Sequence, residues 1–148
     1  MRRARKNQRI MPQKQAVATF DAIMRELKSG EFSPIYLLMG EESYYIDQIC
    51  DYIQTHALTP EQQAFDQTVV FGADVNAAQI ADLAMQYPMM SPRKVIIVKE
   101  AQDLKLNEEE QNIFLKYIEN PVPSTILIFA HKQKKIDSRK KFAKALEH

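Results

Sequence analysis

The chain has 148 residues, of which 45% are hydrophobic and 26% charged, and its formal net charge is +1. This length and apolar content are enough for one buried core. No apolar run approaches the ~20 residues that span a bilayer, and no apolar stretch follows the basic start of the chain, which argues against a membrane span and a secretory signal. We therefore expect a soluble, cytoplasmic protein without membrane contact.

The net charge hides a segregated distribution. Residues 1–14 carry six basic and no acidic residues, residues 131–148 carry seven basic and two acidic ones, and the segment between them has a net charge of −10. Basic ends on an acidic body indicate contact with something anionic. Residues 1–13 are interpreted as a disordered basic extension because their start lacks apolar periodicity. The last three residues, 146–148, look like an expression-tag remnant.

Apolar periodicity and turn residues divide the body of the chain into alternating helices and strands. Thr59-Pro60 is interpreted as a break in the chain, and Asn107 with Glu110 as a capping box. Helices are expected over about 16–28, over about 43–56, from Asn76, from Asn107 to a stop at Asn120-Pro121, and in a basic segment from Asp137 or Ser138. Strands are expected over 35–39, 68–71, 95–98 and 125–129.

The strands at 95–98 and 125–129 are continuously apolar, so both of their faces are expected to be covered. Strands of this kind that alternate with helices predict an α/β fold with three layers, a parallel sheet flanked by helices. The usual last strand of such a fold would follow the basic helix, so the sheet is expected to be truncated before it.

Residues 34–49 look like the phosphate-binding corner of a P-loop NTPase, with an apolar strand, a turn at Gly40 and a helix. A working corner needs a glycine-rich loop, a lysine for the terminal phosphate and Ser or Thr for magnesium. Here Glu41 and Glu42 would repel a triphosphate, and Tyr44-Tyr45 stand near the place of the lysine and serine. The corner is therefore interpreted as a degenerate nucleotide site.

A second check on nucleotide chemistry gives the same answer. The strand at 95–98 is followed by Lys99-Glu100, so a lysine stands where an ATPase needs the aspartate that organises magnesium. We predict no catalytic, cofactor-binding or metal-binding residues. Cys50 is expected to be a buried structural thiol, and His56 and His131 are expected at the surface.

The most informative surface candidate is the segment from Tyr87 to Arg93. Its two prolines, Pro88 and Pro92, have no backbone N–H, so the segment is expected to form neither a helix nor a paired strand. Two adjacent methionines on such a loop cannot easily both face the core, and methionine suits surfaces that dock into apolar pockets. On the residues alone, two interpretations stay open: a docking loop, and a hydrophobic plug that closes the end of the protein's own sheet.

The basic segment near the end of the chain is a candidate for nonspecific contact with DNA or phosphate. An outward-facing charged surface on a last helix, with Phe142 and Leu146 inward, is the favoured interpretation. The candidate contact residues are Lys134, Lys135, Arg139 and Lys140.

Three stretches of the chain, in order and at matching spacing, resemble the N-terminal domain of the delta subunit of bacterial DNA polymerase III, a clamp-loader component. They are Ile35–Tyr44 with Ile46-Asp47, Met89–Lys99 and Lys135–Lys141. The resemblance implies an AAA+-like domain over residues 14–145 that binds no ATP and no other cofactor.

The resemblance also implies a partner and a site. Met89 and Met90 correspond to an apolar pair that inserts into a pocket on the sliding clamp (the beta subunit), with Tyr87 and Arg93 as rim residues. The family often has Leu or Phe at this pair, so the two methionines are a departure. The implied action is mechanical, because the domain would open the clamp by stabilising an opened interface through differential binding.

The protein would then be a non-catalytic subunit of the DNA-directed DNA polymerase III holoenzyme, a nucleotidyltransferase complex. Its ATP-binding and other clamp-loader partners would bind through later domains absent here, and DNA would be bound weakly or indirectly. The alternatives are an active P-loop ATPase, a P-loop-like adaptor with another protein partner and a weak nucleic-acid-binding module.

Overall fold

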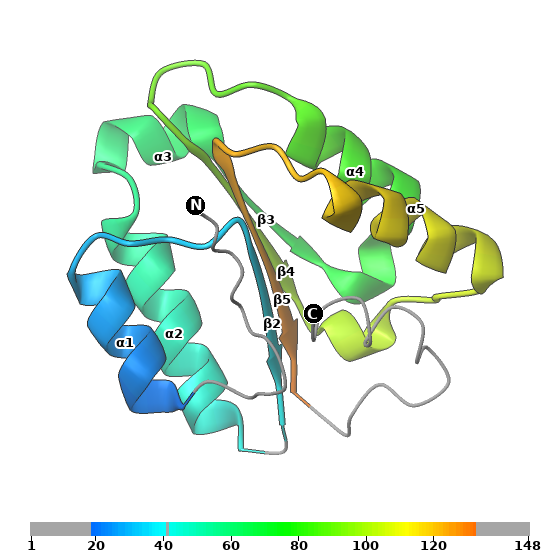
Figure 1. The fold of residues 1–148 in the computed structure, drawn as a ribbon, viewed down its shortest axis with the longest axis horizontal. Helices are drawn as coiled ribbons and strands as arrows, with labels where there is room; N and C mark the ends of the chain where they lie inside the picture. Colours follow the sequence, from blue (N-terminus) through cyan, green and yellow to red (C-terminus); the bar gives the residue numbers. More distant parts are fainter. Residues whose placement is uncertain (1–18, 41, 133–148) are drawn as a thin grey trace.

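The computed structural model describes residues 19–40 and 42–132 as a three-layer α/β fold with a four-stranded sheet at its centre (Figure 1). All neighbouring strands pair in parallel, in the order β2-β5-β4-β3. This confirms the predicted fold class. The strands are β2 (Ile35–Met39), β3 (Gln67–Phe71), β4 (Lys94–Lys99) and β5 (Thr125–His131).

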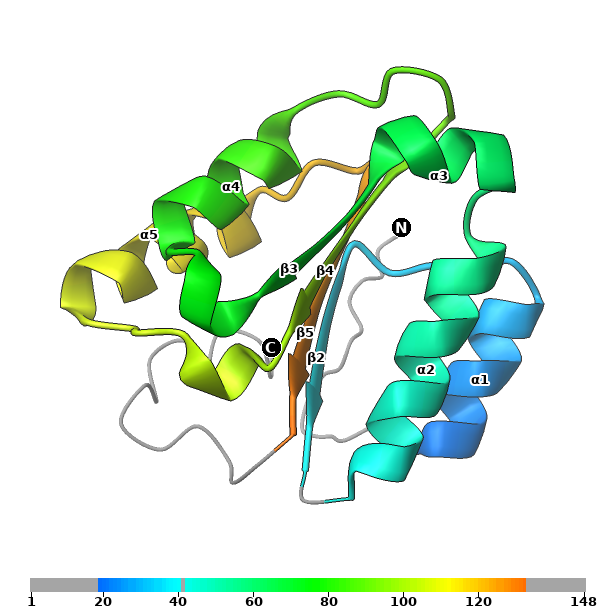
Figure 2. The ribbon, with the colours of Figure 1, turned by 180° about the vertical axis from the view of Figure 1, so that it is seen from behind.

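Helices cover both faces of the sheet (Figures 1 and 2). One face carries α1 (Phe20–Lys28) and α2 (Ser43–His56), and the other carries α4 (Ala77–Met85) and α5 (Glu108–Glu119). The short helix α3 (Pro60–Asp66) leads directly into the amino end of β3. Two 3-10 turns, η1 (Gly72–Asp74) and η2 (Ala101–Asp103), follow the carboxyl ends of β3 and β4.

The central strands supply side chains to two separate cores. Val95 and Ile97 of β4 pack in the core under α1 and α2, whereas Ile96 and Val98 pack in the core under α4 and α5. All four are fully buried. A strand covered on both faces needs apolar residues at every position, which explains the absence of polar alternation in the sequence.

Two helix boundaries differ from the prediction. Thr19 has an extended backbone, and its hydroxyl accepts a hydrogen bond from the N–H of Ala22, so α1 begins at Phe20 and the predicted start near residue 16 is wrong. The break predicted at Thr59-Pro60 is instead the start of α3. Thr59 and Gln62 form a reciprocal capping box, and proline at the first helical position needs no hydrogen-bonded N–H.

The cap of α5 confirms half of its prediction. The Asn107 side chain accepts from the N–H of Glu110 at 2.9 Å, as expected. The carboxylate of Glu110 does not complete a capping box, because it accepts a 3.4 Å hydrogen bond from the N–H of Ala77. Glu110 thus links the first turns of α5 and α4 on one face of the sheet.

Cys50 is buried, as predicted, and burial raises the pKa of its thiol to about 11. His56 is exposed as expected. His131 is buried, so its predicted surface position is wrong: it is the last residue of β5 and pairs with Met39 of β2. No helix in the described residues is long and apolar enough to cross a membrane.

Several predicted features lie outside the described residues. These are the basic extension over 1–13, the basic helix near Asp137, the remnant at 146–148 and the candidate contacts Lys134, Lys135, Arg139 and Lys140. Within the described part of the chain, β2 is an edge strand, paired only with β5.

Candidate functional site

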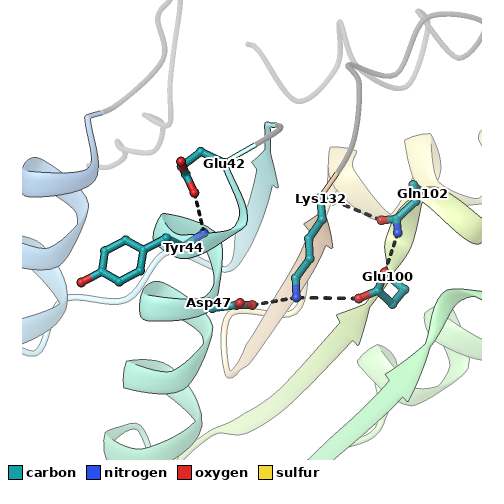
Figure 3. Close-up of polar contacts among 6 residues, drawn as sticks. All are labelled: Glu42, Tyr44, Asp47, Glu100, Gln102 and Lys132. Atoms are coloured by element: carbon teal, nitrogen blue, oxygen red, sulfur yellow. Dashed lines mark hydrogen bonds and ion pairs between the residues drawn. The ribbon is translucent and has the colours of Figure 1, made fainter.

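The carboxyl ends of β2, β4 and β5 meet at the corner where a P-loop protein binds nucleotide. Gly40 ends β2 with a φ of 152°, and its N–H donates to the carbonyl of His131 at 3.2 Å. The Glu42 carboxylate then caps α2 by accepting from the N–H of Tyr44 at 3.2 Å (Figure 3). A helix N-terminus is where such folds hold phosphate, and here the protein's own carboxylate uses it.

Lys132, directly after β5, joins the two sides of this corner (Figure 3). Its ammonium lies 2.8 Å from Asp47 of α2 and 3.7 Å from Glu100, which follows β4. The Gln102 side chain completes the network, since it donates to Glu100 and accepts from the N–H of Lys132 at 3.1 Å. The hydrogen bond to Asp47 raises the pKa of Lys132, so the ammonium form is favoured.

This arrangement is unsuited to magnesium-nucleotide chemistry. The acidic group that follows β4, Glu100, already has an ammonium as its counter-ion, and a divalent cation at that carboxylate would meet the charge of Lys132. Tyr44 and Tyr45, near the predicted place of the P-loop lysine and serine, are aromatic side chains at the molecular surface. The geometry agrees with the interpretation of a degenerate corner.

The opposite, amino-terminal edge of the sheet carries the methionine loop, residues 87–93, between α4 and β4 (Figure 1). The relative exposure is 79% for Tyr87, 76% for Met89 and 56% for Met90. Neither methionine closes the end of the core, so the plug interpretation is wrong. The loop presents three large side chains to solvent, and the exposed fraction of each is far above that of a core residue.

The backbone beneath these side chains is held by one buried carboxylate. Asp66, the last residue of α3, has no exposed surface. Its Oδ1 accepts from the N–H of Met89 at 2.5 Å, and its Oδ2 accepts from the N–H groups of Met90 and Ser91, both at 2.8 Å. The Ser91 hydroxyl also lies 2.8 Å from Oδ2. Successive backbone N–H groups that converge in this way form an anion-binding concavity.

Burial on its own would raise the pKa of the Asp66 carboxyl. The hydrogen bonds from Met89, Met90 and Ser91 outweigh it and lower the pKa to about 2. Each of these bonds stabilises the charged form. Asp66 is therefore an anion at neutral pH.

Arg93 ends the loop. Its guanidinium lies 4.5 Å from the centre of the Phe32 ring, a cation–π contact with the segment before β2. Both residues line a hollow of ≈ 270 Å³ together with Pro92 and Pro123. Of the predicted rim residues, Tyr87 is mostly exposed to solvent, whereas Arg93 is partly buried in this contact.

Sequence reasoning missed Asp66 and Lys132. A capping box at Thr59, a proline at the first helical position and an acidic residue before an apolar strand indicate a short helix that ends at Asp66. They do not indicate its partners, which lie 23 to 25 residues away. Lys132 was grouped with the basic end of the chain, although it belongs to the corner with Asp47 and Glu100.

The chain matches known proteins over most of its length. The family described as "DNA polymerase III, delta subunit" matches residues 36–148. The chain is 32% identical over 132 residues to the Bacillus subtilis protein named DNA polymerase III subunit delta, and the match covers 84% of this chain and 38% of that relative.

A solved structure shows the same fold. The Bacillus subtilis DNA clamp loader delta protein superposes with a TM-score of 0.76 at 27% sequence identity, covering 87% of this chain and 40% of that one. The chain thus spans about 40% of the length of the relatives it matches.

Proposed function

Since the chain belongs to the family of DNA polymerase III delta subunits, we propose that it acts in clamp loading during DNA replication, as a module that binds the sliding clamp. The binding element is the methionine loop, with Met89 and Met90 as apolar anchors and Tyr87 beside them. Arg93 contributes at the rim. The observation that carries this proposal is the exposure of both methionines, 76% and 56%, on a backbone that Asp66 anchors.

Such a loop fits an apolar pocket on a partner. Burying one methionine side chain stabilises a complex by about 1.5–3 kcal/mol before the losses of association are counted. Two adjacent methionines on a held backbone can fill one pocket, because their unbranched side chains adapt to its shape. A few such anchors dominate the free energy of most interfaces.

The proposed action is mechanical and needs no catalytic residue in this domain, which we assign to residues 14–145. The loop stabilises an opened clamp interface because it binds that state better than the closed one. ATP has no place at the degenerate corner, where Glu42 caps α2 and Lys132 neutralises Glu100. We assign the contacts with ATP-binding and other clamp-loader subunits to segments outside this domain, and any weak contact with DNA to the basic residues Lys134, Lys135, Arg139 and Lys140.

The test is a calorimetric titration of the chain into the cognate sliding clamp, beside the double variant Met89→Ala/Met90→Ala. We expect the double variant to bind at least about tenfold more weakly, a change of roughly 1.4 kcal/mol. Tyr44→Ala is the matched control, because Tyr44 is exposed to a similar degree, 58%, at the opposite edge of the sheet. Equal affinity of the double variant and the wild type would remove the loop from the interface.

The same titration and two further measurements test the alternatives. An adaptor for another protein predicts no binding of the clamp by the wild-type chain. A nucleic-acid-binding module predicts binding to short DNA duplexes that weakens steeply as salt rises. An active ATPase predicts that millimolar Mg-ATP raises the melting temperature, since a ligand that binds only the folded state stabilises it.

A further inference from the structure

The backbone of the methionine loop makes few hydrogen bonds within the loop itself. Pro88 and Pro92 have no N–H, and among the described residues no backbone carbonyl accepts a hydrogen bond from a backbone N–H of residues 87–93. The Ser91 hydroxyl donates to the carbonyl of Arg93 within the loop. Both ends are fixed, because the N–H of Gln86 bonds to the carbonyl of Leu83 and that of Lys94 bonds to the carbonyl of Ser124. The conformation between these ends therefore depends on contacts from elsewhere in the chain.

Asp66 supplies that contact. The N–H groups of Met89, Met90 and Ser91 converge on its two carboxylate oxygens at 2.5 to 2.8 Å. The carboxylate is fully buried at the end of α3, where β3 begins. It is thus attached to the rigid sheet and not to the loop that it binds.

The backbone and the side chains of the two methionines therefore have different surroundings. The N–H groups of Met89 and Met90 point inward to Asp66, while their side chains are mostly exposed. Two apolar side chains in water gain from collapsing onto the protein surface. A fixed backbone opposes that collapse and lowers the entropy lost when the side chains enter a partner's pocket.

We propose that Asp66 is a positioning residue for partner binding: its carboxylate fixes the backbone from Met89 to Ser91 so that both methionines stay presented to the clamp. This inference rests on the proposed function. Asp66 itself touches no partner, because it is fully buried beneath the loop.

The chemistry of this position requires a carboxylate. Both oxygens accept, Oδ1 from Met89 and Oδ2 from Met90 and Ser91. An asparagine has the same shape, but its amide carries two donors on one side and only one acceptor oxygen. In Asp66→Asn, at least one backbone N–H would face an N–H₂ group, so the loop would lose its fixed conformation while the side-chain volume stays the same.

The experiment compares Asp66→Asn with the wild-type chain by two measurements. Amide hydrogen exchange in the free protein is expected to rise about tenfold or more at Met89, Met90 and Ser91 and to stay unchanged in β4 and β5. Calorimetric titration is expected to show a clamp Kd about tenfold higher. Tyr117→Phe is the matched control, because it removes a buried acceptor from the N–H of Val122, away from the loop.

The outcomes separate the two proposals. If Met89→Ala/Met90→Ala loses binding while Asp66→Asn keeps a Kd within twofold of wild type, the loop binds the clamp and the positioning role is overturned. If the double methionine variant binds like wild type, the proposed function fails, and the positioning role falls with it whatever the exchange shows. A Kd that rises equally in Tyr117→Phe also overturns the positioning role, because general destabilisation would explain it.

Should Asp66→Asn fail to fold, Ser91→Ala decides. It removes the hydroxyl that lies 2.8 Å from Oδ2 and that also contacts the carbonyl of Arg93, and it keeps the three backbone hydrogen bonds to Asp66. We expect faster exchange at Met90 and Ser91 and a smaller rise in the clamp Kd. In the wild-type chain, exchange at Met89, Met90 and Ser91 as fast as in the unfolded chain would overturn the proposal, because hydrogen bonds to Asp66 must slow it.

Discussion

The Oδ2 atom of Asp66 accepts a 2.8 Å hydrogen bond from the backbone N–H of Met90, 24 residues further along the chain. The same carboxylate binds the N–H groups of Met89 and Ser91. One buried side chain at the end of α3 thereby joins the short helix, the amino end of the sheet and the exposed loop. This contact makes the stability of the protein and the shape of the loop depend on one charge.

Removing that charge is expected to destabilise the whole protein. Asp66→Ala leaves three backbone N–H groups without their acceptor, and hydrogen bonds to charged groups are worth more than neutral ones, so we expect the free energy of unfolding to fall by about 2–4 kcal/mol. Urea denaturation followed by circular dichroism measures this. Asp82→Ala, at an exposed position on α4, should change stability by less than about 0.5 kcal/mol. Equal effects of the two substitutions would contradict the role of Asp66.

Acid should reduce stability through the same residue. The folded protein holds the pKa of Asp66 at about 2, below the unfolded value of about 3.9. A lowered folded pKa means that the contribution of the carboxylate is complete above about pH 4 and is lost as the pH falls through about 2. Urea denaturation of wild type and Asp66→Asn at several pH values should show their stability difference shrinking from pH 4 to pH 2. A difference that stays constant over this range would contradict the lowered pKa.

The sheet was predictable from the sequence because its information is local. The inner residues of β4 and β5, 95–98 and 126–130, are apolar without interruption, which fits a strand buried on both faces, and Gly40 and Gly72 follow the ends of β2 and β3. The exposure of Met89 and Met90 was also within reach, since two prolines bracket them. What the sequence left open there was the choice between a docking loop and a plug, because that choice depends on the backbone conformation.

The anchoring of the loop was beyond the sequence. Asp66 gains its role from three partners 23 to 25 residues away, and no periodicity records which N–H groups a carboxylate will meet. The ion pairs of Lys132 were beyond the sequence for a similar reason. Its ion pairs with Asp47 and Glu100 exist because β5 places it between α2 and the end of β4.

The Lys132 network is expected to contribute little to stability despite its position. The relative exposure of the side chains is 26% for Lys132 and 50% for Asp47, so water screens the pair. A double-mutant cycle with Lys132→Met and Asp47→Asn should give a coupling energy of about 0.2–1 kcal/mol. The coupling should fall further in 1 M salt, where the Debye length is about 3 Å. A coupling energy above about 2 kcal/mol would contradict this expectation and would mean that the ion pair contributes strongly to the stability of the fold.

The glycines at two turns separate steric collision from backbone strain. A Cβ on Gly72 would collide with the backbone carbonyl of Glu100, where η1 approaches η2, so Gly72→Ala should lower the free energy of unfolding by about 1–3 kcal/mol or more. Gly30, with a φ of +87°, has no atom within 4 Å of an added Cβ, so Gly30→Ala should lose only the roughly 1–2 kcal/mol of a left-handed backbone.

Urea denaturation of Gly72→Ala, Gly72→Val and the same pair at Gly30 distinguishes the two causes. Collision predicts that valine is much worse than alanine at position 72, whereas strain alone predicts a smaller difference at position 30. A tolerated Gly72→Val would show that the approach of the two turns is not required.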